Sequence, residues 1–126
     1  MRINEKLLQP HILFSSNNQI MTEGDEISLN DTYTKYKYIE IIWCPNQYNY
    51  LQSVKIDTSA GSNVILFGGY LSGGTPRYLQ PLTVIAYFSS NKFIVNRMAG
   101  VNINTSTYSI GSLNSTPKLF RIIGYK

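Results

Sequence analysis

The chain has 126 residues, about the size of one domain, and a formal net charge of +4. Apolar residues make up 43% of it, enough for a core, whereas charged residues make up only 14%. Asn, Ser, Thr and Gly account for 43 of the 126 residues, and ten Tyr stand against three Ala. Aromatic and turn-forming residues favour strands joined by tight loops. The composition therefore excludes an all-helical protein and predicts a single all-β domain.

The positive charge is spread along the sequence rather than gathered in one stripe. Only Lys35 and Lys37 lie close together, and Glu40 follows them. Nucleic-acid binders usually concentrate basic residues along a phosphate track, so we expect no nucleic-acid partner. Cys44 and His11 are the only cysteine and histidine, which leaves no intrachain disulfide and no Cys/His metal site. We expect Cys44 to be a small buried side chain, and no metal or cofactor.

No stretch of the sequence approaches the roughly 18 apolar residues needed to cross a bilayer. Residues 1–10 form a short polar lead that ends at Pro10 and lacks the apolar core of a signal peptide. We expect no membrane partner and a soluble product made in a cytoplasm. The predicted organisation is this lead, followed by one β-sandwich domain over residues 11–126.

Apolar runs recur every ten to fifteen residues, with turn signals between them. The predicted strands cover residues 11–15, 19–22, 26–29, 36–44, 50–57, 64–71, 82–88, 92–98, 101–110 and 118–125. Glu23-Gly24-Asp25 is typical of a β-hairpin turn between the second and third of these. Ala99-Gly100 predicts a further turn. Nine or ten short strands without a helical period predict an antiparallel β-sandwich of jelly-roll type.

Two of the predicted strands, residues 64–71 and 82–88, have apolar side chains on both faces. Val64-Ile65-Leu66-Phe67 is the clearest such run. Strands of this kind are covered on both sides, whereas a small sandwich covers only one face of each of its sheets. The surplus indicates burial against another copy of the chain.

The sequence contains only weak catalytic signals. The acids of residues 23–26 crowd one predicted turn, where solvated charge is ordinary. Glu40 and Asp57 occupy outward strand positions, but their spacing does not make them converge as a glycoside-hydrolase pair. No Gly-x-Ser-x-Gly turn accompanies His11, and the glycine-rich residues 68–75 lack the Gly-Lys-Ser/Thr of a phosphate loop. We therefore expect no enzymatic activity.

The predicted loops offer aromatic and amide side chains instead. Aromatic faces stack on the C–H faces of sugar rings, while Asn, Gln and Arg form hydrogen bonds with hydroxyls. The candidate carbohydrate-binding residues are Asn46, Tyr48, Tyr50, Tyr70, Arg77 and Tyr78. The alternative is that each of these side chains only packs within the β domain.

Three stretches of the chain are similar to motifs of one known family. Leu13-Phe14-Ser15-Ser16 resembles its opening Leu-Trp-Ser-Gly, with Phe and Ser in place of Trp and Gly. Gly24–Leu29 followed by Tyr36–Ile41 resembles its block of a serine or threonine between apolar residues and then Tyr-x-x-Ile-x-Ile. Leu119–Lys126 resembles its ending Ile-x-x-Ile-x-Gly-Tyr/Ile-Lys. The family is the C-terminal head or receptor-binding domain of tail-fibre and baseplate proteins from bacteriophages of low-GC bacteria.

The resemblance implies a homotrimeric antiparallel β-sandwich in the virion, at the tip of a phage tail. It implies contacts with other tail or virion proteins and attachment to host cell-surface saccharide without cleavage. Such domains normally end a long fibre protein, so the chain is either a separate small virion protein or part of a longer one. Two alternatives stay open: a structural tail, baseplate or head-decoration protein that binds only other virion proteins, and a fragment of a glycan-degrading tailspike.

Overall fold

The computed structural model describes residues 9–46, 50–113 and 116–126, which form an all-β structure without an α-helix. Its strands are β1 (Pro10–Ile20), β2 (Glu26–Ser28), β3 (Tyr38–Cys44), β4 (Gln52–Asp57), β5 (Asn63–Gly68), β6 (Tyr78–Leu79), β7 (Leu82–Ser89), β8 (Lys92–Asn104), β9 (Ile110–Ser112) and β10 (Lys118–Tyr125). Two short 3-10 turns are present, η1 (Tyr33–Lys35) and η2 (Thr58–Ala60).

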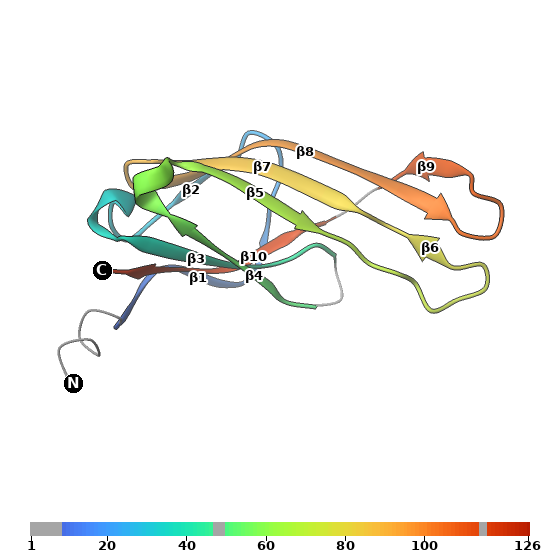
Figure 1. The fold of residues 1–126 in the computed structure, drawn as a ribbon, viewed down its shortest axis with the longest axis horizontal. Helices are drawn as coiled ribbons and strands as arrows, with labels where there is room; N and C mark the ends of the chain where they lie inside the picture. Colours follow the sequence, from blue (N-terminus) through green and yellow to red (C-terminus); the bar gives the residue numbers. More distant parts are fainter. Residues whose placement is uncertain (1–8, 47–49, 114–115) are drawn as a thin grey trace.

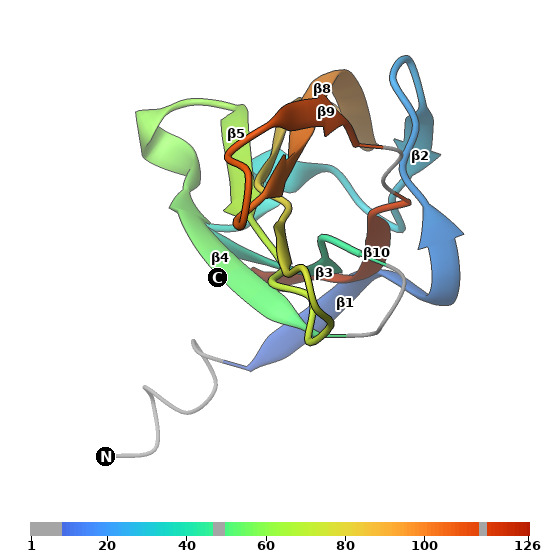
Figure 2. The same cartoon turned by 90° about the vertical axis from the view of Figure 1, so that its right-hand side faces the viewer.

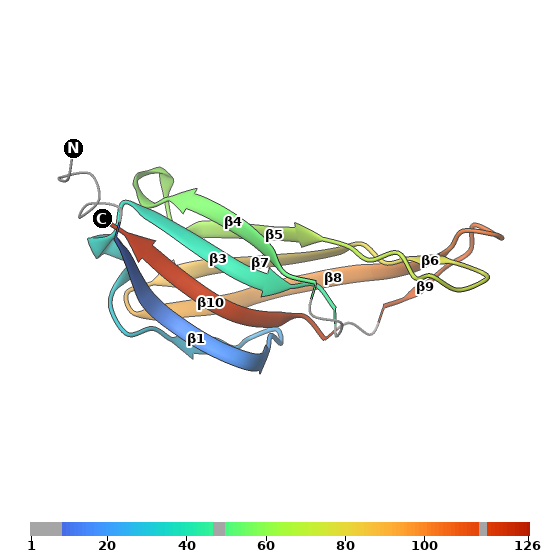
Figure 3. The ribbon, with the colours of Figure 1, turned by 90° about the horizontal axis from the view of Figure 1, so that it is seen from below.

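The strands form two antiparallel sheets that pack face to face, which confirms the predicted sandwich (Figure 1). Sheet A has the strand order β1-β10-β3-β4, and Figure 3 shows these four strands side by side. Sheet B has the order β2-β8-β7-β5, with β6 and β9 also paired to β8. The chain crosses between the two sheets four times, from β1 to β2, β2 to β3, β4 to β5 and β9 to β10.

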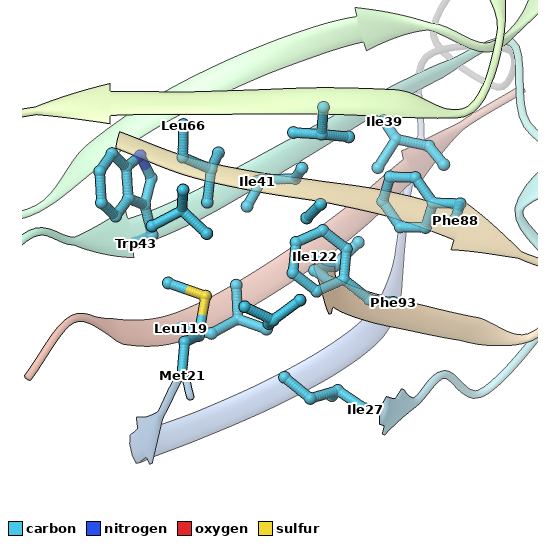
Figure 4. Close-up of a cluster of buried hydrophobic side chains, with 14 of the residues drawn as sticks. Met21, Ile27, Ile39, Ile41, Trp43, Leu66, Phe88, Phe93, Leu119 and Ile122 are labelled. Carbon is cyan, nitrogen blue, oxygen red and sulfur yellow. The ribbon is translucent and has the colours of Figure 1, made fainter. Parts of the chain in front are cut away.

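The core lies between the sheets and is built from both of them (Figure 4). Ile39, Ile41 and Trp43 of β3 are buried, as their alternation in the sequence predicts. From sheet B, Phe93 contributes a ring that is 0% exposed and packs against the other core side chains. The Cys44 side chain is buried as predicted, and its thiol donates a hydrogen bond to a backbone carbonyl two residues further on.

The predicted β-hairpin around Gly24 is wrong, although a tight turn is present. The Asp25 N–H donates to the Thr22 carbonyl at 3.0 Å, and Gly24 adopts a φ of 89°. However, β1 pairs with β10 and β2 pairs with β8, so this turn leads the chain from sheet A to sheet B. The Gly24 N–H donates to Val95 of β8 at 2.7 Å, which anchors the turn to a strand far along the sequence.

The predicted turn at Ala99-Gly100 is also wrong, because β8 runs unbroken through both residues. A Cβ on Gly100 would lie 2.7 Å from the Leu113 side chain and 3.1 Å from the Pro81 carbonyl oxygen. The glycine therefore allows a close approach within a strand rather than a reversal of the chain.

The reversal occurs at residues 105–109, within the stretch predicted as one strand over residues 101–110. The side-chain oxygen of Asn104 accepts hydrogen bonds from the N–H groups of Ser106 and Thr107 at 2.9 and 3.3 Å. These bonds give the backbone an alternative to the sheet ladder, which is why Asn favours turns. β9 then returns along the end of β8.

β8 is longer than the sandwich, and its C-terminal half forms an arm together with β6 and β9. We define the arm as residues 69–81 and 101–113. It extends past the end of sheet A (Figures 1 and 3) and points toward the viewer in Figure 2. Pro10 pairs with Tyr125 at the opposite end of the molecule. The arm is therefore distant from both ends of the described chain.

Gly124 lies directly against the ring of Tyr36, where a Cβ would come within 2.5 Å of two ring carbons. The Tyr36 hydroxyl donates to Asp31, so the buried ring cannot shift freely. We expect Gly124→Ala to lower the free energy of unfolding by about 1–3 kcal/mol. Gly111→Ala is the matched control, because its nearest contact would be 3.8 Å away. Equal denaturant midpoints for the two variants would contradict this account.

Candidate functional site

One face of the arm is polar and aromatic. Tyr70 and Gln80 exchange two backbone hydrogen bonds, of 3.3 and 2.8 Å, so their side chains share a face. Tyr78 lies on the same face, and the Gln80 amide donates to the Asn102 side chain at 3.0 Å. We call this surface, made of Tyr70, Tyr78, Gln80 and Asn102, the aromatic face of the arm.

Tyr50, which precedes β4, adds a third ring to this surface. Its ring stacks on Tyr70 with 5.9 Å between centroids and 23° between planes, and Tyr50 is 62% exposed. Rings with an open face and neighbouring amides have the chemistry of a saccharide platform. The aromatic face with Tyr50 is the candidate binding site.

The structure brings together three of the predicted carbohydrate-binding residues, Tyr50, Tyr70 and Tyr78. Arg77 is exposed near them at the tip of the arm, where its carbonyl accepts hydrogen bonds from the Thr105 N–H and hydroxyl, both at 2.9 Å. These bonds tie the two tips of the arm together. They involve only the backbone of Arg77, so the structure places this residue next to Tyr78 in the chain without joining its guanidinium to the aromatic face.

Two predicted residues do not join this group. Asn46 is only 8% exposed, and its carbonyl accepts the Cys44 thiol at 2.8 Å. The chain folds inward at the end of β3, which makes Asn46 part of the interior and removes it from the candidate site. Tyr48 lies outside the described residues.

Sequence reasoning missed Gln80 and Asn102. Gln80 stands between apolar residues just before Pro81, and Asn102 lies in a run that alternates with Val and Ile. The alternation does predict that the Asn102 side chain lies on the other face of its strand from Val101 and Ile103. Its position beside Gln80 depends on the pairing of β6 with β8, which links residues more than twenty positions apart.

The other face of the arm is apolar. Leu71 lies opposite Leu79, Leu79 opposite Ile103, and Ile103 opposite Ile110, so the four side chains form one row. Leu71, Leu79 and Ile110 are 50%, 42% and 70% exposed. Val101 of β8 lies two residues before Ile103 and faces the same way.

This row continues onto the outer face of sheet B. Ala99 precedes Val101 on the same side of β8, and it lies opposite Thr83, which lies opposite Phe67. Ile65 and Phe67 of β5 are 63% and 71% exposed. Thus β5, predicted to be apolar on both faces, has outward side chains that nothing within the described part of one chain covers. We call this continuous surface, made of Ile65, Phe67, Leu71, Leu79, Val101, Ile103 and Ile110, the apolar face.

Two shallow cavities of about 230 Å³ each indent the outer face of sheet B next to this surface. They adjoin at Thr83 and Ala99, and one of them is lined by Ile85, Arg97 and Glu23 as well. The apolar face is therefore not flat, and a partner could insert side chains into it.

The described acids have structural partners. Glu23 accepts the Met98 N–H at 2.7 Å, and Glu40 accepts the Tyr125 hydroxyl at 3.0 Å. Asp57 caps η2 by accepting the N–H and hydroxyl of Ser59, which hold the pKa of its carboxyl below the usual value. Glu40 and Asp57 thus serve the fold, and no group of acids or His/Cys among the described residues could hold a metal ion.

Tyr36, which is buried, and Tyr125, which is half-buried, make the stability of the protein depend on pH in the alkaline range. Burial raises the pKa of Tyr36 above 10.0, and the hydrogen bond to Asp31 raises it further; burial and Glu40 do the same to Tyr125. The unfolded chain releases these protons at lower pH than the folded chain. The contribution of these two tyrosines to the free energy of unfolding should therefore be constant at pH values well below 10 and be lost as the pH rises above 10.

Denaturation curves at several pH values between about 8 and 12 test this expectation. Tyr36→Phe should reduce the alkaline loss, since it removes one of the two titrating hydroxyls. An unchanged pH profile in Tyr36→Phe would contradict it.

The comparisons with known proteins find no family model that matches the chain and no match among curated proteins. No helix within the described residues has the length and apolar character to span a membrane.

Proposed function

We propose that the chain is a non-enzymatic attachment domain of a bacteriophage tail that assembles as a homotrimer and recognises host cell-surface saccharide. The observation that carries the proposal is the two-faced arm, which projects an aromatic face and an apolar face at the end opposite Pro10 and Tyr125. One face has the chemistry of a sugar platform and the other that of a subunit interface. Its place is in the virion, with other tail proteins as neighbours.

The aromatic face supports saccharide recognition by its composition. The open ring of Tyr50 offers a stacking surface for the apolar side of a sugar ring. The amides of Gln80 and Asn102 offer donors and acceptors for hydroxyls. A surface of this kind binds weakly by itself, so attachment requires several copies to act together.

The apolar face supports assembly with further copies of this chain. Five of its side chains expose on the order of 600 Å² together, close to the roughly 800 Å² that each partner buries in a stable interface. The centre of the face has no charged side chain. Elsewhere on sheet B, Lys92 pairs with Glu26 at 3.7 Å, and Glu23 lines a cavity together with Arg97. Identical copies can therefore meet at the centre of the apolar face without repulsion.

A structural virion protein that binds only other virion proteins is the second candidate. The same apolar face favours it, because an exposed apolar surface can also seat on a different virion protein. The two functions differ in whether the protein by itself adsorbs to cells.

The deciding experiment incubates fluorescently labelled protein with a panel of low-GC bacteria, with and without their purified surface polysaccharide as competitor. Saturable adsorption that the polysaccharide inhibits supports attachment, whereas no adsorption to any strain favours the structural function. The length of the polysaccharide chains is measured after incubation, and shortened chains would overturn the non-enzymatic assignment.

A further inference from the structure

The outer face of sheet A contains a small cavity that is separate from the aromatic face. It lies where two strands depart from regular pairing, β1 between Ser15 and Gln19 and β10 between Leu119 and Arg121. Such bulges re-aim side chains and are common beside binding sites. The lining residues are Ser16, Asn17, Ile42, Leu51, Phe120 and Arg121.

The size of the cavity restricts what it can hold. Its volume is about 130 Å³. A water molecule occupies about 30 Å³ in the liquid, so the cavity has room for about four waters. That is the space of one carboxylate or phosphate group with part of a sugar ring, and not of an oligosaccharide.

The two sides of the cavity differ in chemistry. Ile42, Leu51 and Phe120 form an apolar wall that can cover the C–H side of a ring. Asn17 and Arg121 supply N–H donors on the polar side. The Ser16 hydroxyl oxygen accepts the Asn18 N–H at 3.3 Å, so its hydrogen is free to be donated to a ligand.

The charge of Arg121 is not balanced within the described part of the chain, where no acid forms an ion pair with it. Glu40, two residues before Ile42 on β3, accepts the Tyr125 hydroxyl instead and lies opposite Lys55. The cavity on sheet B differs in that an acid, Glu23, lines it together with Arg97, although no ion pair joins these two side chains. A guanidinium without an acid, next to further donors, favours an anionic ligand.

The cavity also lies one residue along the chain from the candidate saccharide site. Leu51 lines the cavity, and the preceding residue, Tyr50, stacks on Tyr70 of the arm. The cavity and the candidate saccharide site therefore share the segment of chain that precedes β4.

We infer that this cavity binds the carboxylate or phosphate of a charged sugar unit through Arg121, Asn17 and Ser16. The inference deepens the proposed attachment function and rests on it, since it names charged saccharide as the substrate class. Arg121 forms the charge-assisted hydrogen bonds, and Phe120 covers the ring.

The test titrates the full chain with glucuronate, glucose 1-phosphate and glucose, followed by amide NMR shifts. We expect the better of the two anions to bind at least about tenfold more tightly than glucose, with shifts at Ser16, Asn17 and Arg121. The two anions show separately whether carboxylate or phosphate is preferred. Arg121→Gln should remove the preference, whereas Arg97→Gln, the matched control on sheet B, should keep it. Added salt should weaken the anions only.

Equal binding of all three sugars, or an equal effect of the two arginine variants, would overturn the inference. If the proposed attachment function is wrong but the cavity does bind anions, the result differs: anions bind at Arg121, but the protein adsorbs to no cell. If Arg121→Gln does not fold, Asn17→Ala, at an exposed position, should weaken binding of the better anion by removing one of its hydrogen-bond donors, and unchanged binding would overturn the inference.

Discussion

Replacing Ile65 and Phe67 together by Glu should separate the assembled protein into single chains. Sedimentation is expected to give about three times the 14.3 kDa chain mass for the unchanged protein and one chain mass for the double variant. Both side chains lie on the apolar face and are more than half exposed in the single chain. Burying two carboxylates in an apolar interface costs several kcal/mol, which raises the dissociation constant by about a thousandfold or more.

The matched control replaces Ile12 and Ile20 by Glu. These side chains are 47% and 46% exposed on β1 of sheet A, so the two variants add the same charge to exposed positions on different sheets, with the control positions somewhat less exposed. The control should keep the assembled mass, and both variants should keep the thermal midpoint of a folded chain. A single-chain mass for the unchanged protein would remove the homotrimer from the proposed function, and equal dissociation of both variants would remove this interface.

Replacing Tyr50 or Tyr78 by Ala should weaken adsorption to host cells more than any other change on the arm. Loss of one stacking ring is expected to weaken a single site about tenfold, or about 1.4 kcal/mol. If three copies bind one cell together, the three tenfold losses of affinity multiply, so the avidity for the cell should fall by up to about a thousandfold. Cell adsorption and a titration with the purified saccharide measure the two effects.

Thermal melting separates contact from packing in these variants. Tyr50 is exposed and should leave the midpoint nearly unchanged, apart from its stacking on Tyr70. A lowered midpoint for Tyr78→Ala would assign that half-buried ring to the structure of the arm. Tyr38→Ala, an exposed tyrosine on β3, is the control and should adsorb normally. Normal adsorption of both Tyr50→Ala and Tyr78→Ala would contradict the candidate site.

Alternation of apolar residues was enough to predict where most strands lie. Residues 118–125 match β10 exactly in extent, and the buried residues of β3 are the predicted ones. The periodicity of a strand depends on which side chains must leave water, and that information is local. The two-sided strands were recognised for the same reason, and the exposure of Ile65 and Phe67 agrees with the surplus apolar surface.

Turn residues were less informative about the fold, because they indicate a chain reversal or a close contact but not which strands pair. Gly24 turns the chain between sheets rather than within a hairpin, and Gly100 makes room for Leu113 inside a strand. Both outcomes depend on residues distant in sequence. No local pattern contains this information.

By itself, the sequence determined the all-β class, the approximate positions of most of the longer strands and the excess of apolar strand surface. Each of these follows from composition and a two-residue period, which any short segment displays. Only the tertiary structure decided that β8 extends beyond the sandwich to form part of the arm, that the Tyr50 ring stacks on Tyr70, and that Asn46 is buried. The reason is that a binding surface is made by the pairing of distant strands, and pairing depends on how the whole chain buries its core.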